Sequence, residues 1–597
     1  MSISFRKRQP VTKRRLRARI PHLEILDDRL LLSANPIVTE NQLSGTPENV
    51  WLVPQGQADT ALEGFSTDIS VDVGKTISFK ITDTTLDPYS IDIYRIGYYG
   101  GDGARLVTTI PSSQISPKNQ PAPIRNAATG EVDAGNWSVS ATWAVPSTAV
   151  SGVYLADLVD AKTGGMNMIV FVVRNDASHS QILFQTDDST WQAYNDWGGA
   201  NNAPGASLYI GNGPSSYQGA AYAVSYNRPL NNYNGTSEEN FHDEFFYAEF
   251  PMVEWLEKNG YDVSYFTDVD ADRSGSLIEN HQIWMDAGHD EYWSGNEFNN
   301  VMAARNAGVD LAFFSGNTAF WKTYYWTSID GSSTPDRTLV CYKETHLNNG
   351  AGEAPSQVDT IDPNANLWTG AWADPRFSPP PDGGIGQNEL TGTFFDVNQG
   401  PDPTGTPITV PSTDDNLPIW RNTAVAKGQS SIGGQVLGYE WDSDVNNAFR
   451  PVGEIDMSST TESGSQMQVM NDYGNTFSGT TATHSLTEYR ASSGALVFSA
   501  GTVQWSWGLC NDPFNGYDTD NLPDPDPNMQ QATVNLFADM GAQPGTLQAG
   551  LVPATQTALS SAPPTTAITG PLPGASLPSG TPVTIKGTAS AASGAFV

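Results

Sequence analysis

The stretch 286–294, which reads DAGHDEYWS, joins two apolar segments and limits what this part of the chain can become. The preceding residues 282–285 are largely apolar and predict a buried strand, and residues 310–314 predict the next strand. A strand, a helix and a second strand in succession indicate a parallel sheet covered by helices. Residues 289–292 should therefore lie at the carboxyl edge of such a sheet, where open α/β sheets bind their ligands.

The connection between these two strands carries the signals of a helix. Ser294 and Glu297 stand three residues apart, as in a capping box, and Phe298 and Val301 share one apolar face. Gly308 supplies the left-handed residue that ends many helices. The helix is therefore expected to run from Ser294 to about Gly308.

The same alternation of strand and helix recurs along the chain. Residues 182–186 and 261–267 predict strands, and Pro251 suits the first turn of a helix that opens there. Residues 529–540 have one apolar face and predict a late helix of the same sheet. We therefore expect a doubly wound α/β domain over 176–545, similar to glutamine-amidotransferase-like domains, with large β-rich insertions.

Three other segments differ in composition from this domain. Residues 36–175 contain no convincing helix and alternate polar and apolar positions between turn residues, which predicts an antiparallel β-sandwich. Residues 546–565 are rich in Pro, Thr and Ala and indicate a linker. Residues 566–597 resemble the opening strands of a bacterial immunoglobulin-like domain, and about 30 residues can form only part of one.

Residues 1–35 lack the pattern of a folded segment. They begin with a basic run, and the apolar residues that follow are interrupted by Glu24, Asp27 and Asp28. A disordered tail is one interpretation. The stretch 22–34, which reads HLEILDDRLLLSA, resembles the leader at the start of many large exported planctomycete proteins. This resemblance implies an extracellular or cell-surface location.

The chain is strongly acidic outside this leader. The 597 residues carry a formal charge of −35, and the 567 residues after Leu30 hold 21 Lys and Arg against 62 Asp and Glu. Such a body repels nucleic acid and anionic membrane surfaces, so neither is an expected partner. Because no run of eighteen apolar residues occurs, no membrane span is expected either.

The cysteines and the common catalytic motifs exclude several classes of protein. Two cysteines, Cys341 and Cys510, cannot build a disulfide framework or a four-thiolate zinc site, although one bridge or two buried thiols both remain open. The chain has no HExxH, paired CxxC or GxSxG pattern, which excludes the common zincins, zinc ribbons and α/β-hydrolases. Cys341 would need His289 or His346 beside it to act as a nucleophile, and a buried structural thiol is the favoured alternative.

Two segments rich in glycine or aromatic residues are candidates for ligand binding. Residues 94–105, YRIGYYGGDGAR, look like a phosphate cradle, but no helix pattern follows, so a structural turn with two tyrosines packed against the next domain is favoured. Trp191, Tyr194 and Asn195 follow the strand 182–186 and should lie at the same sheet edge as residues 289–292. They are candidate substrate-binding residues, and a packed loop is the alternative.

Oxygen-bearing side chains offer a site for a hard cation. Carboxylates and phenolates suit iron and similar ions, which could activate water and polarise a carbonyl. The side chains of this kind are Tyr292, Tyr342, Glu291, Glu344, Glu440 and Asp442.

Several motifs in order resemble the N,N-dimethylformamidase large-subunit family over about residues 94–541. They are YRIGYYGG at 94–101, GHDEYWS at 288–294, FSGN at 314–317, GYEWD at 438–442 and VFSAGT at 497–502. The resemblance implies hydrolysis of a formamide to formate and an amine, with one iron held by two tyrosines and a glutamate.

The resemblance implies particular ligands in this chain. Tyr292 matches one tyrosine and Glu440 the glutamate. Tyr342 is the preferred second tyrosine because it lies in a compact motif, and Tyr324 and Tyr325 are alternatives that follow Phe320, a residue that stands where an aromatic ligand is expected.

These observations lead to two hypotheses. In the first, iron held by Tyr292, Tyr342 and Glu440 activates water to attack a small amide substrate, with His289 or Glu291 carrying the proton. In the second, the protein is a non-catalytic exported surface module whose Trp- and Tyr-rich pocket binds a glycan or a partner protein. Both are compatible with a homo-oligomer.

Overall fold

The computed structural model describes residues 35–54, 56–198, 206–215, 218–231, 244–346, 361–364, 367–377, 384–401, 405–510, 524–557, 565–572, 574–577 and 583–590. Within these ranges the protein is a multi-sheet, β-rich molecule with few helices. The predicted leader falls, except for its last residue, outside the described part. Among the described residues, no helix has the length and apolar character needed to cross a membrane.

Residues 62–174 form two sheets with a common hydrophobic core. One has the strand order β1-β3-β8 and the other β2-β10-β9-β4-β5, and all pairs are antiparallel except β2 with β10. The rings of Phe79 and Phe171, from opposite sheets, meet edge to face at 5.7 Å. The bounds are β1 (Leu62–Ser66), β2 (Ser70–Asp72), β3 (Thr76–Asp83), β4 (Tyr89–Ile96), β5 (Ala104–Ile110), β8 (Ala141–Ala144), β9 (Gly152–Asp160) and β10 (Met166–Arg174).

Smaller elements accompany these sheets. Two short helices, α1 (Pro36–Glu40) and α2 (Glu48–Trp51), precede β1, in a segment where the sequence predicted no helix. They are only five and four residues long, so they show no helical periodicity. A short antiparallel pair, β6 (Ile124–Arg125) and β7 (Val132–Asp133), lies between β5 and β8 in the chain.

A seven-stranded sheet follows, with the order β13-β11-β14-β16-β29-β28-β23. The first five strands are mutually parallel, and β28 and β23 continue the sheet in antiparallel pairs. Their bounds are β11 (Ile182–Thr186), β13 (Val263–Thr267), β14 (Ile283–Gly288), β16 (Asp310–Ser315), β23 (Ile455–Asp456), β28 (Thr487–Arg490) and β29 (Leu496–Ser499). The predicted strands at 182–186, 261–267, 282–285 and 310–314 therefore exist.

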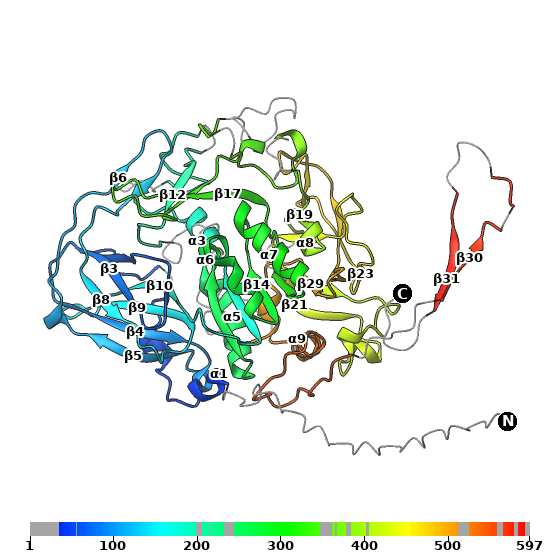
Figure 1. Cartoon of the computed structure of the whole chain (residues 1–597), viewed down its shortest axis with the longest axis horizontal. Helices are drawn as coiled ribbons and strands as arrows, with labels where there is room; N and C mark the ends of the chain where they lie inside the picture. The colour runs from blue at the N-terminus through cyan, green and yellow to red at the C-terminus, as the bar shows by residue number, and fades with distance from the viewer. Residues whose placement is uncertain are drawn as a thin grey trace, which may run out of the picture. The chain divides into compact units, whose positions relative to one another are not determined.

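Helices pack on both faces of this sheet (Figure 1). Ile283 and Met285 of β14 share a core with α5 (Phe245–Lys258) and α9 (Pro527–Asp539). Trp284 belongs to a second core with α6 (Asp268–Ser274) and α7 (Gly295–Ala307). Successive residues of a strand point to opposite faces, and β14 is apolar on both.

The ends of two helices test the sequence signals. For α7, both hydrogen bonds of the Ser294–Glu297 capping box are present and Gly308 has φ of 107°, as predicted. For α5, the prediction was wrong, because the helix begins at Phe245 and contains Pro251 in its interior. The apolar residues ahead of the proline, such as Phe246 and Phe250, are buried and extend the packed face of the helix backwards.

Several smaller sheets are formed by strands that lie between residues 223 and 484. Strand order is β12-β18-β17-β15 in one, β24-β27-β22-β19-β25-β26 in another, and β20 pairs with β21. The bounds are α8 (Asn388–Thr391), β12 (Ala223–Ser225), β15 (Tyr292–Ser294), β17 (Trp321–Trp326), β18 (Thr338–Val340), β19 (Phe394–Gln399), β20 (Thr406–Thr409), β21 (Ser431–Leu437), β22 (Trp441–Ser443), β24 (Thr460–Ser463), β25 (Gln468–Asn471), β26 (Thr476–Phe477) and β27 (Thr481–His484). Near the end, β30 (Thr565–Gly570) pairs with β31 (Lys586–Ser590).

The glycine-rich segment 94–105 joins the first sheets to the α/β part. Arg95 of β4 donates to both carboxylate oxygens of Glu257 in α5, at 2.7 and 2.9 Å, and both side chains are fully buried. Gly97 lies so close to this pair that a Cβ atom would meet Glu257 Oε2 at 2.3 Å. Tyr99 donates to Glu40 at 2.9 Å. The segment is therefore a structural connection.

Candidate functional site

The carboxyl ends of three neighbouring parallel strands converge on the segment 289–291. Strand β14 ends at Gly288, and the chain passes through residues 289–291 before pairing again as β15. The end of β11 leads into α3 (Asp188–Tyr194), and the end of β13 leads into α6. The backbone N–H of His289 donates to Asp187 Oδ2 at 2.9 Å, and that of Glu291 to Thr190 Oγ1 at 3.0 Å. These bonds tie the segment to α3.

Two tyrosines meet the Glu291 carboxylate. Tyr194 of α3 donates to Glu291 Oε2 at 3.1 Å, and Tyr209 donates to both carboxylate oxygens at 2.8 and 3.1 Å. The two rings stack with centroids 4.1 Å apart. Tyr292 donates to the Tyr209 hydroxyl at 2.5 Å. Three oxygen-bearing side chains, Tyr194, Tyr209 and Glu291, therefore converge at one place.

His289 links this group to a second carboxylate. Its Nε2 lies 3.0 Å from Glu440 Oε2 and 3.6 Å from Glu291 Oε2. The Asn317 amide nitrogen lies 3.0 Å from both His289 Nε2 and Glu440 Oε2. Asn317 has φ of 52°, a conformation that asparagine tolerates better than most residues, and its backbone N–H donates to Asp442 at 2.9 Å. The Asn317 amide donates to His289 Nε2 when that nitrogen carries no proton, whereas a protonated Nε2 donates to Glu440 instead.

A lysine covers the tyrosines. Lys343 Nζ lies 3.3 Å from the ring centroid of Tyr209, 5.3 Å from that of Tyr292 and 5.0 Å from that of Trp321. Burial lowers the pKa of Lys343 to about 8, and the nearby Glu291 carboxylate opposes that shift. The backbone of Lys343 has φ of 49°, which is uncommon for a lysine.

The titration behaviour of the group follows from its burial. Burial raises the pKa of Tyr209 and of Tyr292, and the Glu291 carboxylate raises both further. Burial also raises the pKa of Glu291, while His289 and Lys343 oppose the shift. With their pKa values raised in this way, the phenols keep their protons at neutral pH. A positive ion among these oxygens would reverse that preference.

Asp290 points the other way, into a group of carboxylates. Asp268, Asp290 and Glu297 each offer an oxygen, and these oxygens lie within 4.8 Å of one another. All three side chains are buried. This acidic group could hold a metal ion. The Gln185 amide nitrogen donates to Glu297 Oε1 at 2.7 Å and to Asp268 Oδ1 at 2.8 Å.

The other predicted site residues lie as follows. Trp191 donates to Glu249 at 2.7 Å, and Asn195 donates to the Pro229 carbonyl at 2.9 Å, so both anchor α3. Tyr342 stacks on Tyr222 with centroids 4.8 Å apart, in an apolar cluster with Ala223 and Val340. The structure thus brings together His289, Glu291, Tyr292, Tyr194 and Glu440, and it places Tyr342 in a different cluster.

The alternatives to Tyr342 and the cysteines lie in packed surroundings. Tyr324 donates to Asp362, and Phe320 packs edge to face on Trp321. Cys341 and Cys510 are buried free thiols. Burial raises the pKa of Cys341 to about 12, which disfavours a thiolate nucleophile there. The side chain of His346 falls outside the described residues.

Sequence reasoning did not assign roles to Tyr209, Asn317 and Lys343. Tyr209 lies in an irregular, glycine- and serine-rich segment with no periodicity, so its sequence context gives no signal. Asn317 stands in the FSGN motif, whose glycine and asparagine are typical of a strained turn. Lys343 directly follows Tyr342, the residue that the sequence favoured.

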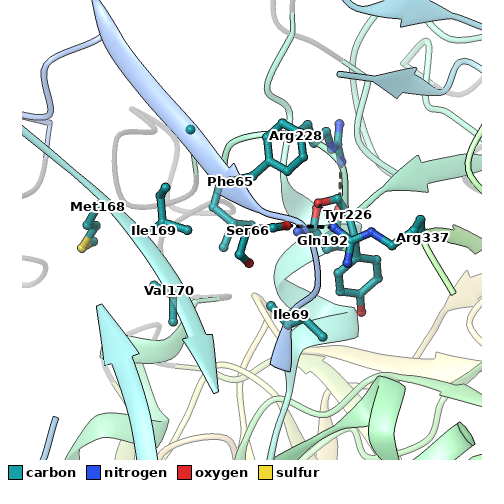
Figure 2. A pocket seen from close by; sticks show the side chains of 12 residues that line it. Phe65, Ser66, Ile69, Met168, Ile169, Val170, Gln192, Tyr226, Arg228 and Arg337 are labelled. Carbon is teal, nitrogen blue, oxygen red and sulfur yellow. Dashed lines mark hydrogen bonds between the residues drawn. The ribbon is translucent and has the colours of Figure 1, made fainter. Parts of the chain in front are cut away.

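A small cavity lies elsewhere, between β1, β10 and α3 (Figure 2). It leaves about 20 Å³ for the centre of a water-sized molecule, which is room for roughly one water. Its buried arginines, Arg228 and Arg337, donate to backbone carbonyls such as those of Gln192 and Ser66. The residues around Glu291 do not line it, so this cavity is a packing feature.

Comparison with known proteins agrees with the motifs. No curated protein gives a match to the chain. A family model described as N,N-dimethylformamidase beta subunit-like, C-terminal, matches residues 90–519, which include every residue of the group around Glu291. The chain belongs to the N,N-dimethylformamidase beta subunit-like, C-terminal family.

Proposed function

We propose that the protein is a metal-dependent hydrolase of amide C–N bonds, with an iron ion held by Tyr194, Tyr209 and Glu291. The observation that carries the proposal is the convergence of both phenol oxygens on the Glu291 carboxylate, within 3.1 Å. Membership of the family supports a dimethylformamidase-like hydrolase. The two tyrosines and one glutamate are the ligand types that the family resemblance implies.

The chemistry of these donors fits iron. Carboxylate and phenolate oxygens are hard ligands that suit a hard cation, and all three come from buried or partly buried side chains. Tyr292 donates to Tyr209 and would orient that ligand from outside the first coordination shell. In this assignment, the ligands are Tyr194, Tyr209 and Glu291. They replace Tyr292, Tyr342 and Glu440, the ligands that the family resemblance implied.

When bound, the iron would supply a Lewis acid that polarises the amide carbonyl and acidifies a water. Glu440 and His289 are placed to handle protons, because His289 Nε2 lies between Glu440 and Glu291. We assign Glu440 as the base that accepts a proton from the water and His289 as the group that delivers a proton to the departing amine. The Asn317 amide nitrogen contacts both side chains and positions them relative to each other.

Lys343 adds a positive charge on the other side of the tyrosines. An ammonium over the Tyr209 ring stabilises the phenolate form of that ligand and the negative charge that develops on the substrate oxygen. A small substrate suits this arrangement, because aromatic rings and charged groups close in on Glu291 from several elements.

Three wider assignments accompany this function as proposals. The seven-stranded sheet with helices on both faces supports a glutamine-amidotransferase-like α/β domain within 176–545, after a β-sandwich over 36–175. The leader resemblance of residues 1–35 supports export to the cell surface or beyond. Residues 566–597 would then begin a further immunoglobulin-like domain.

The function is tested by turnover with the full chain. Protein reconstituted with ferrous or ferric iron is offered a panel of formamides and acetamides, and formate or acetate release is measured. We expect iron-dependent release, and we expect Glu440→Gln to keep its iron but to lose about 100-fold or more in rate. Iron-loaded protein with no turnover on any amide would favour the non-catalytic binding module.

A further inference from the structure

Seven carboxylates are buried together on the side of the sheet edge that Asp290 faces. They are Asp187, Asp188, Glu249, Asp268, Asp286, Asp290 and Glu297. Within the described ranges none of them makes an ion pair with a lysine, arginine or histidine, whereas buried Glu257 is paired with Arg95. Burial raises the pKa of every one of them. Buried charges are normally paired or bound to a metal.

Hydrogen bonds compensate this group only in part. Trp284 Nε1 donates to Gln185 Oε1 at 3.0 Å, and this bond turns the amide nitrogen of Gln185 toward the carboxylates. That nitrogen has two hydrogens, and the short contacts to Asp268 and Glu297 use both. Asp290 Oδ2 is left 3.4 Å from the nitrogen.

Asp290 therefore receives a longer hydrogen bond from Gln185 than Asp268 and Glu297 do. Its other oxygen, Oδ1, is buried and has no hydrogen-bond partner, and the side chain has no exposed surface. Asp187 Oδ1 and Asp286 Oδ1 are buried and unpartnered as well, and both carboxylates act electrostatically on Asp290. An unpaired buried oxygen costs free energy, and a positive ion beside Asp290 would remove that cost.

The spacing suits a calcium-sized ion. One oxygen each from Asp268, Asp290 and Glu297 lie within 4.8 Å of one another. Calcium binds oxygens at about 2.3–2.6 Å, which puts opposite ligands about 4.6–5.2 Å apart, and it accepts carboxylate-rich sites. The Gln185 nitrogen acts as an uncharged and incomplete substitute for such an ion.

We propose that Asp268, Asp290 and Glu297 form a structural site for a hard divalent cation of the calcium class, separate from the tyrosine and glutamate site. The ion joins the ends of β13 and β14 to the first turn of α7. This site does not depend on the amide hydrolase function. Calcium entry displaces the Gln185 amide, which changes the surroundings of the Trp284 indole.

The test uses the full chain after treatment with a chelator. Calcium is added back and thermal unfolding is followed, and terbium is added as a luminescent calcium substitute that nearby tryptophans sensitise. We expect calcium to raise the Tm by about 5 °C and terbium to luminesce when the tryptophans are excited, because Trp284 lies next to the site. An unchanged Tm together with dark terbium at pH 8 would overturn the proposal and leave protons as the neutralising partner.

Variants locate the ion. Asp290→Asn and Glu297→Gln should each abolish the calcium shift and the terbium signal, and glutamine still serves the capping box of α7. Asp310→Asn is the matched control, because Asp310 is a partly buried carboxylate at the other end of the same sheet, bonded to the Leu496 N–H. It should keep both responses. If Asp290→Asn fails to fold, the wild-type titration and Glu297→Gln still decide the outcome.

One further variant separates this proposal from the proposed function. Tyr209→Phe lies on the other side of the segment, so it should keep the calcium shift whether or not the protein hydrolyses amides. Loss of the shift in Tyr209→Phe would contradict a separate site. Calcium binding without any amide turnover would leave the cation site intact and count only against the hydrolase.

Discussion

The two sides of the segment 289–291 differ in how they treat buried carboxylates. On one side, Glu291 is surrounded by two phenols, an imidazole and an ammonium group. On the other side, Asp290 meets other carboxylates and the amide of Gln185. Neighbouring residues of one short segment thus serve two chemically opposite environments. The first is equipped to move protons, and the second is equipped to hold a positive ion.

The largest expected effect is the loss of stability when the buried carboxylate of Glu257 loses its ion-pair partner, Arg95. Arg95→Ala leaves Glu257 buried without its guanidinium, so we expect about 3–5 kcal/mol of destabilisation. Urea unfolding measures this value. Asp290→Asn is the matched comparison, because it removes a charge that has no ion-pair partner, and in calcium-free protein it should leave stability unchanged or raise it. Equal losses in both variants would remove the contrast between the two environments.

The next effect separates the two sides by activity. Glu291→Gln removes a proposed iron ligand, so formate release should fall by about 100-fold or more and the iron content should fall with it. The adjacent Asp290→Asn should keep iron and most of the activity. Metal analysis and rate measurements on the same preparations check this pair. If Asp290→Asn lost its iron and Glu291→Gln kept it, the iron would bind on the Asp290 side of the segment, and the proposed site would be wrong.

The pH dependence of stability sharpens the account of the acidic side. Burial raises the pKa of Asp268 to about 7 and that of Asp286 to about 8, against about 3.9 in an unfolded chain. Their contribution is fully present below about pH 4 and is lost as pH rises through 7 and 8, because the folded state favours the protonated form. Calcium-free protein should lose up to about 1.4 kcal/mol per pH unit for each group.

Calcium should flatten this dependence, since a bound cation stabilises the ionised carboxylates. Unfolding measured from pH 4 to 9, with calcium and with chelator, gives the two curves, and the slope without calcium should lie between about pH 4 and 8. A chelated protein that becomes more stable as the pH rises would have the wrong sign for raised carboxylate pKa values.

The smallest expected effect concerns the lysine on the Glu291 side. Lys343→Met keeps much of the apolar stem but removes the charge over Tyr209, so kcat/KM should fall by about 10-fold while the iron content stays close to wild type. Lys322→Met is a control, because Lys322 is a buried lysine that bonds the Trp368 carbonyl outside the group around Glu291. Equal activity losses in both variants would indicate a general effect of losing a buried lysine.

Local signals in the sequence predicted the scaffold of the site well. The capping box at Ser294, the stop at Gly308 and the strands at both ends of α7 depend on nearby residues, so they can be read without the fold. The start of α5 was predicted wrongly at Pro251. Tertiary packing of the apolar residues before the proline extends the helix back to Phe245.

The composition of the site was less predictable, because it depends on long-range contacts. Tyr194, Tyr209, Glu291, Asn317 and Glu440 come from five different segments, and only the sheet topology determines that they meet. The sequence favoured Tyr342 as a ligand because of its compact motif, and the neighbouring Lys343 is the residue of that motif that reaches Tyr209. Asp290 faces away from Glu291, toward Asp268 and Glu297, and this orientation also depends on long-range contacts between strand ends.

The iron content of Tyr209→Phe and Tyr342→Phe, purified and reconstituted side by side, tests the proposed ligands most directly. Both substitutions remove one hydroxyl group, so they are matched in size and chemistry. We predict that Tyr209→Phe loses most of its iron together with its formate release, whereas Tyr342→Phe retains both near the wild-type level. Iron that stays in Tyr209→Phe and leaves Tyr342→Phe would contradict the site described around Glu291.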